Sequence, residues 1–98
     1  MNAHEILTKV AETITQRGND NGYDKQEERS ATEIALLMKV KYGTEHSEES
    51  VLRTLIALKE VRLNRQLSNG VDPTDTLIDL IGYTALLAEC LTEKNKAP

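Results

Sequence analysis

Apolar residues recur along the chain at spacings of three and four, which is the period of an α-helix. The first such segment runs from about residue 3 to residue 16, and its apolar stripe consists of Ile6, Leu7, Val10 and Ile14. Asn2 and Glu5 have the spacing of a capping box at its start. The stretch 17–22, rich in glycine and asparagine, predicts its end because both residue types tolerate left-handed backbone angles.

Two more helices are predicted in the middle of the chain. The second runs from about residue 25 to residue 42 and ends before Gly43; its apolar residues are Ile34, Leu37, Met38 and Val40. The third runs to about residue 67, with Ser47 as the capping residue and two glutamates in the first turn, where the helix dipole favours negative charge. Ser68, Asn69 and Gly70 predict its end.

The fourth helix has the clearest start signal. Asp72 can cap it, Pro73 suits the first helical position, and Asp75 adds charge to the first turn. The helix is predicted to continue to about residue 91 and is apolar on nearly all sides, which is typical of a helix at the centre of a fold or in an oligomer interface.

These four helices with short connections predict an all-α protein, a four-helix up-and-down bundle that forms homo-oligomers. One domain covers residues 1–98, with 93–98 as a flexible tail. The chain has no tryptophan, no phenylalanine and three tyrosines, so its core must be built mainly from aliphatic side chains.

Charge and cysteine content narrow the partners and the compartment. The net charge of −4 argues against nucleic acid and against an anionic membrane surface as partners. No stretch has the length and apolarity of a membrane span, and the first residues do not resemble a signal peptide. The single cysteine, Cys90, cannot form an internal disulfide, so the expected location is the reducing cytoplasm.

The first candidate site is on the fourth helix. Asp79 lies in a segment with little exposed face, and a buried carboxylate must be paired, bound to a metal or protonated. Asp75 and Tyr83 lie one turn before and one turn after it on the same stripe. Asp75 and Asp79 could share a Mg²⁺ ion. Alternatively, Asp75 is only a first-turn charge and Asp79 pairs with an arginine.

Cationic candidates lie on the third helix. Lys59 and Arg62 are three residues apart and could hold a phosphate or a carboxylate. The alternatives are a solvent-exposed face shared with Glu60, or a buried pair between Arg62 and Asp79.

Further candidates lie at the start of the second helix. Tyr23, Glu28 and Arg29 are possible ligand-binding residues, although a dense charge run at a helix start is more often exposed. His4 and His46 have no second ligand at zinc spacing, so no zinc site is predicted.

Together these stretches resemble a family of small phage and prophage proteins of unknown function. The resemblance covers about residues 17–89 and depends on three motifs in order: Tyr23-Asp24 before Glu28-Arg29-Ser30, then Leu58-Lys59-x-x-Arg62, then Asp75-x-x-x-Asp79-x-x-x-Tyr83. It implies an accessory protein of the host cytoplasm.

A more distant similarity is to the MazG-like, all-α nucleoside triphosphate pyrophosphohydrolases. Residues 79–87 are similar to their last motif helix, but Thr76 stands where that family has a glutamate. The similarity implies a Mg²⁺ held by Asp75, Asp79 and either Glu60 or Glu28. Lys59, Arg62 or Arg29 would then neutralise phosphates.

Two functions follow from these patterns. The favoured one is a non-enzymatic accessory protein that binds a host protein or a small nucleotide. The alternative is a Mg²⁺-dependent nucleoside triphosphate pyrophosphohydrolase. Four or more acidic side chains in one pocket would favour the enzyme, and a carboxylate paired with a guanidinium would favour the structural role.

Overall fold

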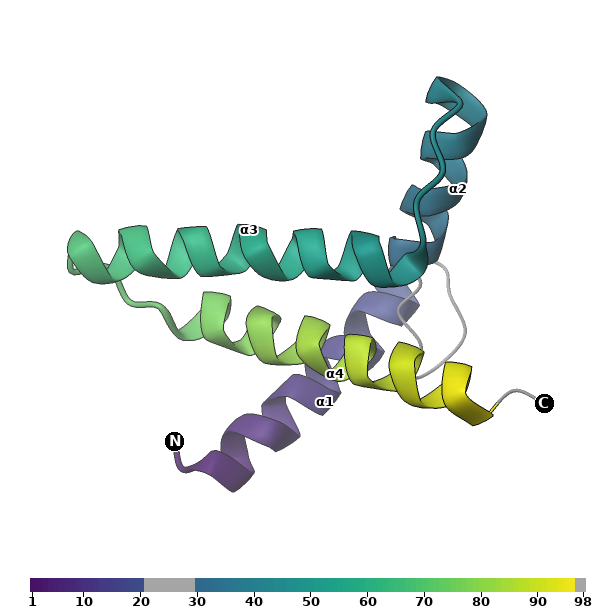
Figure 1. Cartoon of the computed structure of the whole chain (residues 1–98). Coiled ribbons are helices and arrows are strands. Elements are labelled where there is room, and N and C mark those ends of the chain that lie inside the picture. Colours follow the sequence, from purple (N-terminus) through teal and green to yellow (C-terminus); the bar gives the residue numbers. More distant parts are fainter. Residues whose placement is uncertain (21–29, 97–98) are drawn as a thin grey trace.

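The computed structural model describes residues 1–20 and 30–96, with the backbone alone for 94–96. These residues form four α-helices and no strand (Figure 1), so the all-α prediction is confirmed. The helices are α1 (Ala3–Asp20), α2 (Ser30–Tyr42), α3 (Glu48–Ser68) and α4 (Thr74–Lys96).

Helix α4 is at the centre of the arrangement, as its apolar sequence predicts. It runs antiparallel along α3, and α1 crosses its other side (Figure 1). Although α4 is long and apolar, no described helix is long and apolar enough to cross a membrane.

Helix α2 departs from the predicted up-and-down arrangement. Its first turn packs where α3 and α4 meet, and the rest projects away from the body as an arm (Figure 1). Ala31 and Ala35 of α2 contact the core, whereas Val40, near the end of the arm, is largely exposed. Helix α2 departs from the bundle because its apolar residues lie on more than one face, so that no single face holds all of them.

The core has two parts. The first is centred on Ala31, Val51 and Leu52; the partly buried residues around it are Ala35, Leu55, Tyr83, Leu86, Leu87 and Cys90. The second is the crossing of α1 and α4, where Val10 and Ile78 are buried and Gly82 faces α1. Cys90 is thus a partly buried thiol that packs against the core.

The predicted helix ends are confirmed at several positions. The Glu5 amide donates to Asn2 Oδ1 at 2.8 Å, and the Ser50 amide donates to Ser47 Oγ at 3.0 Å. Gly43 and Gly70 both have positive φ, 70° and 66°, which only glycine adopts readily at the end of a helix.

Other boundaries differ from the prediction. Helix α1 does not end at residue 16 but continues to Asp20, with Gly18 buried inside it. The last turn is held by the Gln16–Asp20 hydrogen bond of 2.8 Å and by a tertiary contact of Arg17 described below, and these outweigh the weak helix propensity of glycine and asparagine. Helix α4 extends five residues past the predicted end, to Lys96. Residues 25–29, the predicted start of the second helix, lie outside the described residues.

Gly82 provides a test of the α1–α4 packing. A Cβ at this position would lie 3.8 Å from the nearest side-chain atoms of Val10 and Ile14, which is ordinary van der Waals contact. Since alanine is favoured over glycine inside helices by about 1 kcal/mol, we expect Gly82→Ala to raise the free energy of unfolding by up to that amount. Urea denaturation measures this. Gly82→Leu, which overfills the crossing, should destabilise; a clear loss of stability in Gly82→Ala would show that the helices are closer than described.

The α4 cap provides a test that depends on pH. Asp72 Oδ1 accepts from the Thr74 hydroxyl at 2.6 Å and from the Thr74 amide at 3.0 Å, and these bonds lower the pKa of Asp72. A lowered folded-state pKa means that the stabilisation is present at neutral pH and is lost as pH falls through that pKa. Asp72→Ala should therefore melt at a lower temperature than wild type at pH 7, and the difference should narrow below about pH 4. A difference that stays constant down to pH 2 would contradict this account.

Candidate functional site

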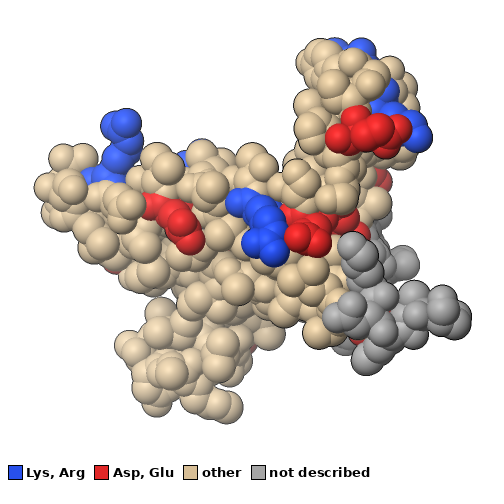
Figure 2. Space-filling view, in the orientation of Figure 1, with Lys and Arg blue, Asp and Glu red and all other residues tan. Residues whose placement is uncertain are grey.

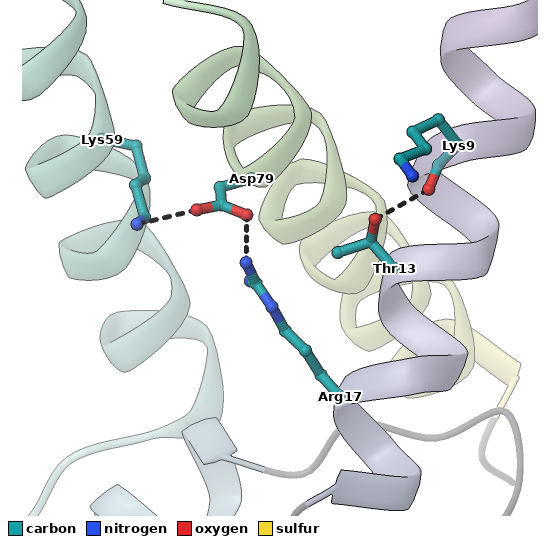
Figure 3. Close-up of polar contacts among 5 residues, drawn as sticks. All are labelled: Lys9, Thr13, Arg17, Lys59 and Asp79. Carbon is teal, nitrogen blue, oxygen red and sulfur yellow. Dashed lines mark hydrogen bonds and ion pairs between the residues drawn. The ribbon is translucent and has the colours of Figure 1, made fainter.

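Asp79 joins three helices. Its Oδ1 accepts from Arg17 Nη2 of α1 at 2.5 Å, and its Oδ2 accepts from Lys59 Nζ of α3 at 3.0 Å (Figure 3). The side chains of Asp79 and Lys59 are each only 13% exposed, whereas that of Arg17 is 41% exposed. We call Arg17, Lys59 and Asp79 the charge triad.

Helical periodicity brings the triad together. Arg17 follows Val10 and Ile14 at i+7 and i+3, so it continues the stripe of α1 that faces α4. Lys59 follows the fully buried Leu52 at i+7 and so lies on the α4-facing side of α3. Asp79 sits next to the buried Ile78, between both neighbouring helices.

Burial explains why Asp79 and Lys59 are paired. A carboxylate removed from water is costly unless its oxygens are hydrogen-bonded or paired, and the same is true of an ammonium group. Each oxygen of Asp79 has a cationic donor, and Lys59 has its counter-ion in Asp79. The charges of Lys59 and Asp79 thus compensate each other, and the more exposed Arg17 ties α1 to the same carboxylate.

A narrow cleft between α1 and α4 lies beside the triad. The described residues that line it are Val10, Thr13, Ile14, Arg17, Ile78, Asp79, Gly82, Tyr83 and Leu86. Its volume of about 10 Å³ matches a single water molecule. The Thr13 hydroxyl donates to the Lys9 carbonyl of its own helix at 2.8 Å (Figure 3), so this donor is already used. The cleft is lined mainly by apolar side chains and offers few polar groups.

A larger pocket lies in the corner between α2 and α3, and we call it the corner pocket. Its volume is about 190 Å³, and it is lined by Ile34, Met38, His46, Ser50, Val51, Thr54 and Leu55. These residues include no lysine or arginine, so the lining suits an apolar group better than a phosphate.

The model of one family matches residues 5–91, most of the chain and all three residues of the triad, and its description is a domain of unknown function, DUF6378. The chain belongs to the DUF6378 family. Comparisons with curated proteins and with solved structures gave no match. The family description mentions neither phage nor pyrophosphohydrolases, so those two interpretations remain hypotheses based on the sequence motifs.

The structure of this DUF6378 domain brings some predicted residues together and separates others. Lys59, Asp79 and Tyr83 gather around the junction of the three helices. Arg62 and Asp75 are exposed, as is Glu60. Tyr23, Glu28 and Arg29 lie outside the described residues. The proposed Arg62–Asp79 pair is wrong, because Lys59 takes the α4-facing position and Arg62, three residues later, points to solvent.

Arg17 is the member of the triad that the sequence interpretation missed. Because the first helix was predicted to end just before Arg17, this residue was not placed on any face of the helix. The signal was nevertheless present, since 10, 14 and 17 have the spacing of one helical stripe.

The described residues contain no group of three or more His, Cys, Asp or Glu side chains able to hold a metal. Of the two carboxylates predicted to share Mg²⁺, Asp75 is exposed and Asp79 accepts from cations at both oxygens. A shared metal between them stays a prediction. The geometry corresponds more closely to the carboxylate–guanidinium pairing expected of a structural role.

Removal of one charge should reveal the role of the triad in the stability of this DUF6378 domain. Asp79→Asn leaves Lys59 buried without its counter-ion, so we expect the free energy of unfolding to fall by about 3 kcal/mol, the usual cost of breaking a buried pair. Chemical denaturation measures this. Replacement of both partners, Asp79→Leu with Lys59→Met, should recover most of the loss because no buried charge then remains unpaired.

The matched control is Glu60→Gln, an exposed carboxylate next to Lys59, which should change stability by less than about 0.5 kcal/mol. A loss below about 1 kcal/mol in Asp79→Asn would mean that Asp79 is not paired in a buried site.

Proposed function

We propose that this DUF6378 chain is a non-enzymatic interaction protein in which α2 binds another protein chain. Helices α1, α3 and α4, tied by the charge triad, serve as the scaffold. Helix α2, which projects from the body in the space-filling view (Figure 2), serves as the binding arm. The observation that carries the proposal is the exposure of apolar side chains on α2: Leu36 and Leu37 are each 59% exposed, and Val40 is 77% exposed. We call these three residues the outer stripe.

The outer stripe follows from the period of α2. Ala31, Ala35 and Met38 are spaced by four and three and face α3. The outer stripe, at 36, 37 and 40, falls on the opposite side of the same helix. One apolar face therefore holds α2 to its own chain, and the second is left to water.

The exposed stripe supplies a driving force for association. Complete burial of one leucine or valine side chain contributes about 1.5–3 kcal/mol. Contiguous apolar groups on a projecting helix are typical of helices that dock on a partner. The corner pocket, on the inner side of α2, adds a place for an apolar side chain of the partner.

A protein fits these surfaces better than a small nucleotide does. The corner pocket offers no lysine or arginine to a phosphate, and the cleft beside the triad holds about one water molecule. The cations of the triad, Arg17 and Lys59, already bind Asp79. A location in the cytoplasm of a phage host, where the thiol of Cys90 stays reduced, is compatible with this role.

The alternative function is a Mg²⁺-dependent nucleoside triphosphate pyrophosphohydrolase. It requires Asp79 to exchange its cationic partners for a metal and predicts release of pyrophosphate from a nucleoside triphosphate with Mg²⁺ or Mn²⁺. The proposal predicts no release above the buffer control with any of the common ribo- and deoxyribonucleoside triphosphates.

The binding role is tested with a stripe variant, Leu37→Ser with Val40→Ser. The immobilised wild-type chain should retain a defined protein, either its own chain or another, and the stripe variant should lose it. A matched control is Leu58→Ser with Val61→Ser, which alters exposed apolar residues of α3 and should retain it. The proposal is wrong if both variants retain the same proteins as wild type, or if the chain turns over a nucleotide.

A further inference from the structure

We propose that the partner of the outer stripe is a second copy of this chain, whose α2 packs antiparallel to the first across a two-fold axis. This inference rests on the proposed function, because it takes α2 as the binding surface. It goes further by naming the occupant and the residues that set its direction.

The two ends of the outer stripe are flanked by opposite charges. Glu33 lies one turn before Leu36 and Leu37, on the same side of the helix. At the other end, Lys41 is adjacent to Val40 and borders the stripe. The acidic residue is in the first turn of α2 and the basic residues are in the last turn.

This polarity makes the stripe complementary to itself in one direction only. In an isologous pair, residue i of one copy contacts residue j of the other, and j contacts i. A two-fold axis beside Leu36 and Leu37 places these leucines against the same leucines of the second copy. It also brings Glu33 of each copy close to Lys41 of the other, one ion pair at each end.

The parallel arrangement is disfavoured by the same charges. It would place Glu33 beside Glu33 and Lys41 beside Lys41, and the two helix dipoles would point the same way. Opposite charges at the two ends therefore select the antiparallel pair.

Lys41 is more available for the ion pair than its neighbour Lys39. Lys39 Nζ lies 3.2 Å from Glu45 Oε1 within the same chain. Lys41 Nζ lies 5.3 Å from the centroid of the exposed Tyr42 ring, an interaction that leaves it at the surface.

The size of the stripe sets the expected affinity. Stable interfaces bury about 1,200–2,000 Å² in total. Three apolar residues per copy fall short of that area, so we expect a dimer whose population depends on concentration in the micromolar range.

The pairing is tested by light scattering and sedimentation velocity. The concentration of the chain is varied from low micromolar to several hundred micromolar. Wild type should shift from monomer to dimer over this range, and Leu37→Asp with Val40→Asp should remain monomeric. The control Leu58→Ser with Val61→Ser should behave as wild type. Far-ultraviolet circular dichroism of each variant confirms that the helices persist.

A charge exchange tests the direction of the pair. Glu33→Lys and Lys41→Glu should each weaken self-association by about tenfold in Kd, because each creates like-charge contacts at both ends. An equimolar mixture of the two variants should form a heterodimer at least as tight as the wild-type dimer, and high salt should weaken it. The matched control is the mixture of Lys9→Glu and Glu12→Lys, which change exposed charges of α1. This mixture should associate no more tightly than either of its two variants alone.

The outcomes separate this inference from the function on which it rests. A wild-type monomer at all concentrations that still binds a different protein through the outer stripe overturns the two-fold pair and leaves the binding role intact. A dimer that neither Leu37→Asp with Val40→Asp nor the charge exchange affects overturns the pair as well. Failure of every α2-dependent interaction overturns both proposals.

Discussion

The need to compensate one buried carboxylate organises the scaffold of this protein. Asp79 lies in the central helix, where it has little access to water, and its two oxygens are satisfied by cations from the two flanking helices. Since Lys59 is as deeply buried as Asp79, neither charge can lose its partner without a large cost. The antiparallel pair α3 and α4 and the crossing helix α1 are thereby held in one arrangement by a directional interaction, in addition to non-directional apolar contacts.

The scaffold and α2 use their apolar residues differently. At the crossing of α1 and α4, the small Gly82 allows the helices to pack closely. The apolar side chains of Val10 and Ile78 are therefore buried within the chain. In α2, the inner face packs against the rest of the chain, but the outer stripe is exposed to water. The chain of this DUF6378 domain is thus divided into a scaffold of three packed helices and a fourth helix whose outer face is exposed, and the proposed binding role depends on this division.

Local sequence signals predicted the parts of the fold that depend on local interactions. The caps at Asn2, Ser47 and Asp72 are formed by residues within three positions of each other, so their chemistry is visible in the sequence. The burial of Asp79 was also predictable, because apolar neighbours surround it along its own helix.

Features that depend on contacts between distant segments were not predictable in this way. The last turn of α1 has weak helix propensity. It is held by the contact of Arg17 with Asp79, which lies 62 residues away in the sequence. Lys59 and Arg62 were equivalent candidates in sequence, and only the rotation of α3 against α4 distinguishes them. The direction of α2 was likewise undetermined, since two apolar faces do not reveal which one packs inside the chain.

The most direct test of the account is amide hydrogen exchange of wild type and Asp79→Asn under conditions where both are folded. The account predicts faster exchange concentrated in the last turn of α1 around Arg17 and in α3 around Lys59, because these are the segments that the carboxylate ties to α4. Unchanged protection in both segments, or a loss confined to α4, would contradict the claim that Asp79 holds the three helices together.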